Sequence, residues 1–340
     1  PGEGVQAPRG LALLQRMEED PPRQVQDLPT LETLLGRRLH ISPSQLEKYY
    51  TCRYGYFLQY VLGLKPRRRA ELSADQSGTL MHWVLQMALD PHPGEDNPCA
   101  GLRPFLELDD AAMADLAAAL VDEYARRYLP EDTARFAYLL SRLKKSMTSL
   151  LCYLRDEQNQ SQFKPVACEL KIGRGEDAVP GQVYRLSDGR TVQLVGTVDR
   201  ADEWIEDDGT RWVRVVDYKT GESQLEFAGV EALFNGEAKQ RQSNVLQTLL
   251  YAMMLTHSEG CEAVPALYYV RRMNRPDYSP ELVDRSTGGV GEGYSAYAVD
   301  FERLLGEKLA ELFDPAVPFR ATDDAEHTCR YCDYRQICRR

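Results

Sequence analysis

The chain has 340 residues, of which 43% are hydrophobic and 27% charged, values typical of a soluble globular protein with one large or two modest domains. No apolar run approaches the ~20 residues that span a bilayer, and the first residues lack both an initiator Met and the layout of a signal peptide, so we expect a cytoplasmic protein and a piece of a longer chain. The formal net charge of −11 argues against binding of nucleic acid by charge alone, but it does not exclude an enzyme that acts on nucleic acid.

The N-terminal part is predicted to be a linker followed by helices. Residues 1–40 are rich in proline and charge and have weak periodicity, so we predict an N-terminal extension with one helix at most. Structure is predicted to begin at Ser42-Pro43-Ser44-Gln45, which combines a Ser N-cap, Pro at the first helical position and Gln at the third. A second helix is predicted from about Gly78. Longer helices are predicted over 109–128 and 133–155, where apolar residues recur at helical spacing.

The middle of the chain changes to the period of strands. Residues 165–172, 191–204 and 211–219 are predicted strands. A helix over 238–257, a strand over 265–271, a loop excursion over 274–297 and a final helix over 299–313 follow. This order predicts an α/β fold in which helices flank a central mixed sheet. The sequence has no G-x-x-x-x-G-K-[ST], so it encodes no ATP-driven motor of that type.

Acidic residues on the predicted strands form the first candidate site. Asp217 and Lys219 share one face of a strand, because strand side chains alternate. If 191–204 and 211–219 form a hairpin, Asp199 lies beside Asp217, and two close carboxylates favour a hard cation such as Mg²⁺ between them. Glu169 on the preceding strand is a candidate third carboxylate. The alternatives are a surface ion pair for Asp217 and Lys219 and a solvent-facing side chain for Glu169.

Three further side chains are candidates on the predicted helices. His82 lies in the helix that begins near Gly78, where a structural role is the alternative to metal ligation. Gln247 and Tyr251 are four residues apart on the helix after the sheet, so they share one face. They form either a pair that contacts phosphate or base near the metal, or an ordinary polar stripe.

The cysteines predict a second metal centre. Cys329, Cys332 and Cys338 form a C-x2-C-x5-C cluster at the C-terminus, and the lone Cys52 in the aromatic N-terminal helical segment can supply a fourth thiolate. Such a centre would join the two ends of the chain. Four thiolates suit tetrahedral zinc as well as an iron–sulfur cluster, and the spacing does not separate the two. The other four of the eight cysteines are expected to be buried small hydrophobes.

Several short motifs, in this order along the chain, resemble those of the RecB-type branch of the PD-(D/E)XK nucleases. The motifs are Gly78-Thr79-Leu80-Met81-His82, Cys168-Glu169-Leu170, Gly196-Thr197-Val198-Asp199-Arg200, Val216-Asp217-Tyr218-Lys219-Thr220-Gly221 and Gln247-x-x-x-Tyr251. With residues 42–64 and the terminal cysteines, the chain is similar to the iron–sulfur nuclease domains of AddB-type subunits of bacterial helicase–nucleases. The resemblance covers residues 41–340, with 41–64 and 320–340 forming the cysteine staple.

The resemblance implies a role for each matching residue. It implies that the catalytic metal, Mg²⁺ or Mn²⁺, is held by His82, Asp199, Asp217 and the main-chain carbonyl of Tyr218. Lys219 would orient or help activate the attacking water, and Glu169 would act in the outer part of the site. Gln247 and Tyr251 match the family's Q-x-x-x-Y helix motif. The resemblance also implies a [4Fe–4S] cluster held by Cys52, Cys329, Cys332 and Cys338.

The function implied by the resemblance is metal-dependent exonuclease activity on DNA, with single-stranded ends as the expected substrate. An AddA-like helicase–nuclease subunit is the expected partner, and double-strand break processing for recombinational repair the expected role. One alternative is a stand-alone iron–sulfur exonuclease of the kind used in CRISPR adaptation. The other is a non-catalytic, metal-stapled DNA-binding module. The missing initiator Met favours a domain of a larger subunit over the stand-alone enzyme.

Overall fold

The computed structural model describes residues 24–25, 40–65, 74–99, 104–129, 136–186, 188–235, 241–273, 275, 277–330 and 332–338. Most of the predicted linker 1–40 lies outside these residues. The chain divides into two compact units. The sheet unit comprises residues 40–43 and 70–308, and the terminal unit comprises residues 1–39, 44–69 and 309–340.

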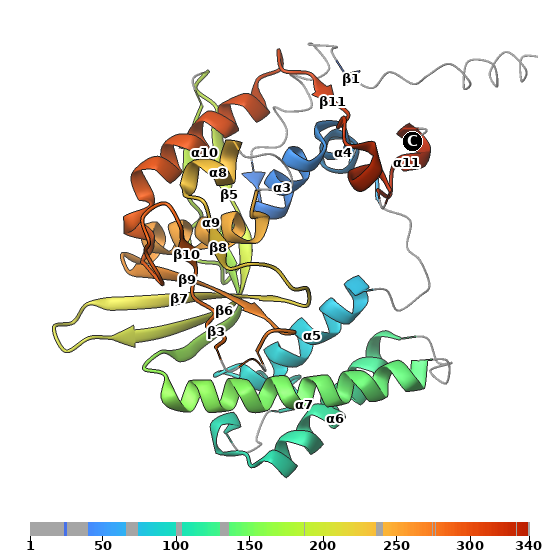
Figure 1. Ribbon diagram of the computed structural model, residues 1–340, viewed down its shortest axis with the longest axis vertical. Helices are drawn as coiled ribbons and strands as arrows, with labels where there is room; N and C mark the ends of the chain where they lie inside the picture. Colours follow the sequence, from blue (N-terminus) through green and yellow to red (C-terminus); the bar gives the residue numbers. More distant parts are fainter. Residues whose placement is uncertain are drawn as a thin grey trace, which may run out of the picture. The chain divides into compact units, whose positions relative to one another are not determined.

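A four-stranded mixed sheet forms the centre of the sheet unit (Figure 1). Its strands, in spatial order, are β3 (Lys164–Ile172), β6 (Gly196–Ile205), β7 (Arg211–Lys219) and β9 (Glu262–Tyr269). Strand β6 runs antiparallel to both β3 and β7, and β9 runs parallel to β7. Apolar and aromatic residues make up most of β7 and β9, as expected for strands with both faces covered.

Three helices cover one face of this sheet: α5 (Ala74–Leu89), α6 (Asp110–Tyr128) and α7 (Ala137–Gln160). Their apolar sides share a buried core with Val216 and Tyr218 of β7 and with Ala266 and Tyr268 of β9. Because strand side chains alternate, Asp217 and Lys219 belong to the opposite face of β7. The core on this face therefore fixes which way the two charged side chains point.

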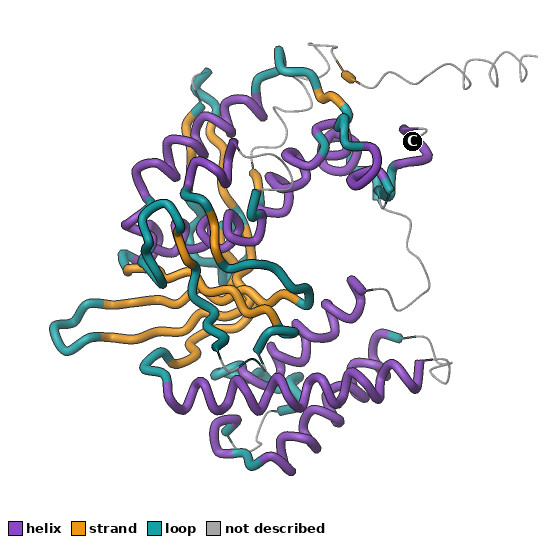
Figure 2. Tube along the Cα trace, viewed as in Figure 1, coloured by secondary structure: helices purple, strands orange, loops and turns teal. Residues whose placement is uncertain are grey.

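Helix α9 (Ser243–Glu259) lies against β7 and β9, on the side of the sheet away from α7 (Figure 2). Ten of its residues are buried, among them an unbroken run from 248 to 255. A helix that is apolar on most sides is one that is covered on most sides. It ends at Gly260, whose φ of 64° is left-handed, the common way to close an α-helix.

Smaller elements complete the sheet unit. A three-stranded sheet is formed by β2 (His40–Ile41), β5 (Thr191–Leu194) and β4 (Val183–Arg185). A parallel pair is formed by β8 (Glu226–Phe227) and β10 (Val283–Asp284). The remaining helical segments are η2 (Phe105–Glu107), α8 (Val230–Asn235), η4 (Tyr294–Ala296) and α10 (Ala298–Phe313).

The structure confirms the mixed sheet flanked by helices and corrects several boundaries. The predicted strand 191–204 is wrong as one strand, since β5 and β6 belong to different sheets. The chain leaves the first sheet at Val195, whose N–H donates to the carbonyl of Ile41. Helix α5 starts at Ala74, before Gly78. Helix α7 continues past 155 to Gln160, and the polar residue Gln158 in its last turn is completely buried.

Two later boundaries also differ. The helix predicted over 238–257 begins at Ser243, and residues 236–240 lie outside the described part. The strand predicted over 265–271 begins three residues earlier and ends at Tyr269. Helices α6 and α10 and strands β3 and β7 match their predicted ranges within one residue.

The terminal unit joins segments from both ends of the chain. Its elements are β1 (Gln24–Val25), α3 (Pro43–Thr51, with Pro43 assigned to the sheet unit), α4 (Arg53–Tyr56), η1 (Phe57–Val61), β11 (Phe319–Arg320), η5 (Ala325–Cys329) and α11 (Arg335–Cys338). Helix α3 begins at the predicted Pro43. The rings of Phe319 and Tyr56 stack with their centres 6.0 Å apart. The Tyr334 hydroxyl donates a hydrogen bond to the main-chain carbonyl of Leu64 at 2.7 Å.

Within the described residues, no helix combines the length and the apolar character needed to cross a membrane.

Candidate active site

The β6–β7 pairing brings the two predicted aspartates together. Arg200 pairs with Val216, so Asp199 and Asp217 stand one position beyond this pair on neighbouring strands. The main-chain N–H of Tyr218 donates to Asp199 Oδ2 at 2.7 Å. Asp199 is therefore fixed by the backbone of the strand that carries Asp217, as the predicted hairpin required.

His82, Glu169 and Asp199 form a compact group of possible metal ligands. One ligand atom from each lies within 4.8 Å of the others, and His82 Nδ1 is 3.4 Å from Asp199 Oδ1. Helix α5 supplies the histidine, β3 the glutamate and β6 the aspartate. The structure thus places Glu169 beside His82 and Asp199, whereas the resemblance implied a position in the outer part of the site.

The backbone of Glu169 is unusual. Its φ of 50° makes it the one non-glycine residue with a left-handed backbone among those described, although it lies within β3. This conformation is disfavoured for residues with a Cβ and costs of order 1–3 kcal/mol. Strain of this kind is common where a side chain is directed into a functional site.

The electrostatics of the group reflect close negative charges. Burial alone would lower the pKa of His82, but the hydrogen bond and charge of Asp199, together with Asp217 and Glu169, raise it. Burial raises the pKa of Glu169, and the charge of Asp199 raises it further. The negative charge of Asp199 thus makes Glu169 harder to ionise, a repulsion that a bound cation relieves.

Asp217 and Lys219 form a buried ion pair that Gln247 completes. Lys219 Nζ lies 2.6 Å from Asp217 Oδ2, and the carboxylate is only 2% exposed. Gln247 on α9 donates to Asp217 Oδ1 at 3.0 Å and accepts from Lys219 Nζ at 3.2 Å. Burial raises the pKa of Asp217 to about 6, against the lowering effect of Lys219. The Asp217 carboxylate is buried, so this pair is not the solvent-exposed surface ion pair considered from the sequence.

Tyr251 packs into the same region through its ring. Its hydroxyl is near Gln247 and the backbone of Thr197, and the ring lies where a Cβ on Gly196 would be, 2.5 Å from Tyr251 Cε1. Gln247 and Tyr251 therefore lie on the face of α9 turned to the site. Gln247 reaches the charged pair, whereas the buried Tyr251 packs behind it.

This donor set fits a hard divalent cation. One imidazole nitrogen and carboxylate oxygens of Glu169 and Asp199 converge from separate elements, and the Asp217 carboxylate lies on the neighbouring strand. Oxygen-rich sites of this kind suit Mg²⁺ or Mn²⁺. Asp217 Oδ2 is buried and, apart from its ion pair with Lys219, makes no hydrogen bond to the described residues. The carboxylate can therefore accept a further partner.

Sequence reasoning missed a network of charged residues on the other face of the same strands. Arg200 and Asp202 are completely buried, and Arg214 is 8% exposed. Both arginines form ion pairs with Asp202. A signal was present in the sequence. Val198, Arg200 and Asp202 stand at every second position and so share one face of the strand, and that face should be apolar if it covers a core.

The four cysteines that are predicted to bind a metal lie in the terminal unit. Cys52 lies between α3 and α4, and its Sγ accepts from the N–H of Gly55 at 3.3 Å. Burial raises the pKa of Tyr54, and the charges of Cys338 and Cys52 raise it further. Among the described residues, no three cysteine sulfurs lie within 4.8 Å of one another, as ligands of one tetrahedral ion with bonds of ~2.3 Å would. The metal staple stays a prediction.

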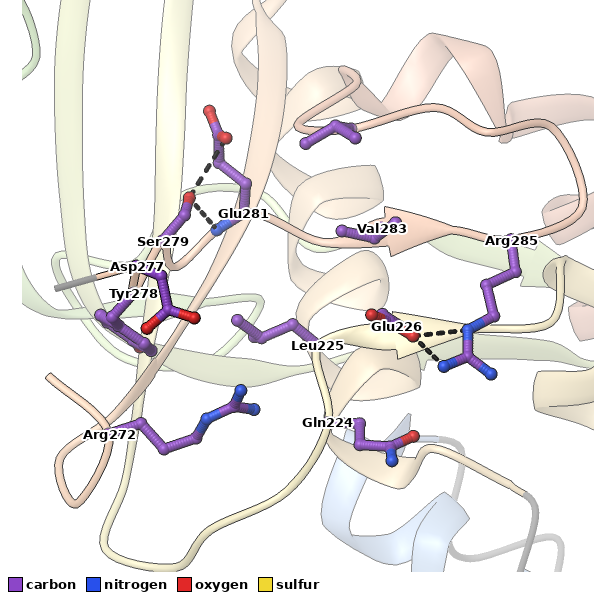
Figure 3. A pocket seen from close by; sticks show the side chains of 11 residues that line it. Gln224, Leu225, Glu226, Arg272, Asp277, Tyr278, Ser279, Glu281, Val283 and Arg285 are labelled. Atoms are coloured by element: carbon purple, nitrogen blue, oxygen red, sulfur yellow. Dashed lines mark hydrogen bonds and ion pairs between the residues drawn. The ribbon is translucent and has the colours of Figure 1, made fainter. Parts of the chain in front are cut away.

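A separate hollow of about 320 Å³ lies near residues that follow β7 and β9 (Figure 3). Its charged lining comprises Glu226, Asp277, Glu281, Arg272 and Arg285. Arg285 is paired with Glu226, and Arg272 Nη1 donates to the carbonyl of Ser223. The hollow contains none of the predicted site residues, and its acidic excess does not favour a phosphate.

The comparison with protein families agrees with this geometry. Residues 40–339 match the model of the PD-(D/E)XK nuclease superfamily. The chain belongs to this superfamily.

The chain is also similar to proteins named as B-type subunits of an ATP-dependent helicase/deoxyribonuclease. The protein of Lacticaseibacillus paracasei is 36% identical over 247 residues, which cover 70% of this chain and 19% of that protein. The protein of Oceanobacillus iheyensis is 27% identical over 303 residues, which cover 88% of this chain and 25% of that protein. The protein of Caldanaerobacter subterraneus is 29% identical over 370 residues, which cover 93% of this chain and 31% of that protein. The chain thus spans between a fifth and a third of the length of these relatives.

Proposed function

We propose that this domain is a divalent-metal-dependent deoxyribonuclease that hydrolyses phosphodiester bonds at the site around Asp199 and Asp217. The observation that carries the proposal is the convergence of His82, Glu169 and Asp199 beside the buried pair of Asp217 and Lys219. An ion pair with only a structural role requires neither a histidine nor two further carboxylates beside it. A metal site for phosphoryl chemistry requires such ligands.

Each side chain has a defined task in this proposal. Lys219 is 23% exposed, so its ammonium can reach both a phosphate and a water at the site. Positive charge there stabilises the transition state more than the ground state. Gln247 holds Lys219 and Asp217 in register by bonding to both, and the Tyr218 N–H holds Asp199.

The proposed cofactor is Mg²⁺ or Mn²⁺. When bound, it supplies charge neutralisation at the phosphate and acidifies a water. The groups that would hold it are His82, Asp199, Asp217 and the main-chain carbonyl of Tyr218, with Glu169 as a further carboxylate.

The proposal predicts that Asp217→Asn and Lys219→Met each abolish cleavage and leave the fold intact. Asp217→Asn removes a negative charge needed at the metal, and Lys219→Met removes the positive charge at the phosphate. The measurement is cleavage of end-labelled single-stranded DNA with Mg²⁺ and after chelation, alongside circular dichroism. Asp208→Asn, an exposed aspartate in the β6–β7 turn, is the matched control.

Two outcomes would contradict the proposal. Full cleavage by either variant would move the chemistry to another site. Binding of DNA by the wild-type chain without any metal-dependent cleavage, including in the presence of a helicase subunit, would favour the non-catalytic DNA-binding module.

We further propose that the domain acts as an exonuclease within a larger helicase–nuclease, with DNA ends as substrate and a helicase subunit as partner. The names of its relatives, which join helicase and deoxyribonuclease, support this proposal. The expected role is break processing for recombinational repair in the cytoplasm. Degradation of linear but not circular single-stranded DNA would support an exonuclease, and cleavage of the circle would contradict it.

For the terminal unit we propose a [4Fe–4S] cluster held by Cys52, Cys329, Cys332 and Cys338. The membership of all four cysteines in one compact unit, built from both ends of the chain, supports this proposal. The choice of a cluster over zinc rests on the resemblance of the chain to the iron–sulfur nuclease domains of AddB-type subunits, because four thiolates suit either centre.

A further inference from the structure

We propose that Arg200 is a positioning residue, which holds β6 and β7 together behind the candidate active site so that Asp199 and Asp217 keep the spacing that a metal requires. The rate measurements below rest on the proposed nuclease function. The metal-binding measurement does not.

Arg200 is placed directly behind the site. It follows Asp199 on β6, and alternation turns its side chain to the opposite face of the sheet. There its guanidinium lies over the ring of Tyr218 on β7 and the ring of Tyr268 on β9, 5.5 Å from each ring centre. Its Nη1 donates to the Tyr218 hydroxyl. The side chain therefore reaches both β7, the strand paired with β6, and β9 beyond it.

The carboxylate of Asp202 also holds the guanidinium of Arg200. Arg200 Nε lies 2.6 Å from Asp202 Oδ1, and Nη2 donates to Asp202 Oδ2 at 2.8 Å. Only the Nη2–Oδ2 contact is a hydrogen bond, because Nε and Oδ1 form an ion pair without hydrogen-bond geometry. Together the two contacts hold the guanidinium against this carboxylate. All of these contacts lie in a region where Arg200 and Asp202 have no exposure to solvent.

The same carboxylate ties the pair to the next strand and to α7. Arg214 of β7 donates to Asp202 Oδ2 through Nε at 2.9 Å and Nη2 at 2.7 Å. Its Nη1 donates to Glu157 on α7 at 2.7 Å. The network therefore fixes the register of β6 against β7 at two points, Tyr218 and Arg214.

Tyr218 connects the network to the active site. Its ring and hydroxyl are held by Arg200, while its main-chain N–H donates to Asp199 at 2.7 Å. Its two chain neighbours are Asp217 and Lys219. A shift of the Tyr218 ring would therefore move the backbone that carries or holds three of the proposed functional side chains.

Stability is a poor explanation for the network. Buried ion pairs recover little beyond the desolvation of their charges, and apolar side chains of similar volume often replace them without loss. What apolar side chains cannot reproduce is the fixed direction of the bonds to Asp202 and Tyr218. This difference allows folding and positioning to be tested separately.

The test is the double variant Arg200→Met with Asp202→Leu, which removes one charge of each sign and leaves Arg214 paired with Glu157. We expect a melting temperature close to that of the wild type and an unchanged KM for DNA. We expect kcat to fall by about a hundredfold, the order that a misplacement of ~1 Å costs. We also expect a smaller rise in melting temperature on adding Mn²⁺. A folded variant with wild-type kcat and wild-type response to Mn²⁺ would overturn the proposal.

Two further variants sharpen the result. Glu203→Leu with Arg211→Met removes an ion pair that joins the same two strands away from the site, and it should leave kcat and the Mn²⁺ response unchanged. Arg200→Lys keeps the charge without the planar fork, so it should not restore kcat. Full recovery with lysine would mean that charge alone matters and would contradict positioning.

Tyr218→Phe decides the matter if the double variant does not fold. It removes one hydroxyl, and we expect kcat to fall about fivefold, the order of one hydrogen bond; an unchanged kcat would count against the proposal. If the wild-type chain does not cut DNA, the nuclease proposal fails by itself. The positioning of a metal site would then stand or fall on whether the Mn²⁺ response of the wild type is lost in the variants.

Discussion

Among single residues, Gly196 matters to the candidate active site because it has no side chain. It starts β6, three residues before Asp199. The ring of Tyr251 occupies the space that a Cβ would need, with Cε1 2.5 Å from that point. Tyr251 is only 6% exposed, so its ring cannot move aside into solvent.

We therefore predict that Gly196→Ala destabilises the protein by about 1–3 kcal/mol, the usual cost of overpacking. The measurement is urea unfolding. Gly78→Ala is the matched control, since its nearest neighbour, Thr220 Cγ2, lies at 3.9 Å and alanine suits the interior of α5. In a Tyr251→Ala background the cost of Gly196→Ala should shrink; an equal cost in both backgrounds would disprove the clash.

Sequence predicted the residues of the site better than their arrangement. The alternation of strand side chains and the predicted hairpin placed three of these residues on neighbouring strands: Asp199 on one, and Asp217 and Lys219 on the other. The approach of His82 and Glu169 depends on how α5 and β3 pack on those strands, which no local pattern contains. The left-handed φ of Glu169 has no sequence signal at all, because glycine or asparagine would be the expected residue there.

At the scale of elements, helices with strong signals at both ends were predicted well. Asp109 caps α6 by accepting from the N–H of Ala112 at 2.8 Å, and the apolar period continues to Tyr128. Elements that depend on tertiary contacts were predicted less well. The break between β5 and β6 follows from the pairing of β5 with β2, and the last turn of α7 contains the buried Gln158.

The cap gives a prediction about α6. Asp109→Ala should destabilise the protein by about 1 kcal/mol, because the helix loses a side-chain acceptor for one of its first N–H groups. Thermal unfolding followed by circular dichroism measures it. Asp115→Ala, at an exposed position in the middle of the same helix, should change stability by less than about 0.5 kcal/mol. Equal losses in the two variants would show that the cap contributes nothing.

At the scale of the whole molecule, the terminal unit depends on segments from opposite ends of the sequence. Holding such ends together costs roughly 5 kcal/mol of chain entropy by logarithmic loop scaling. The packing of Phe319 on Tyr56 and the bond from Tyr334 to Leu64 contribute. A metal–thiolate centre supplies free energy of the required order.

We predict that Cys52→Ser lowers the melting temperature and DNA binding while the Mn²⁺ response of the carboxylate site is kept. The wild-type protein should be brown with broad visible absorbance, and the variant should lose that colour. Cys99→Ser, at a cysteine outside the terminal unit, is the control and should remain brown. An unchanged melting temperature in Cys52→Ser would count against the staple, and a colourless wild type with stoichiometric zinc would replace the cluster by zinc.

The sequence by itself determined the superfamily, the order of most elements and the chemistry available, because alternation, helical period and motif spacing are local properties. Only the tertiary structure decided which groups meet. It placed Glu169 with His82 and Asp199, buried the Asp217–Lys219 pair beneath Gln247, and assembled Arg200, Asp202 and Arg214 behind them. These associations join residues far apart in the chain, and their energies come from burial and desolvation, which depend on what covers a residue and not on its neighbours in sequence.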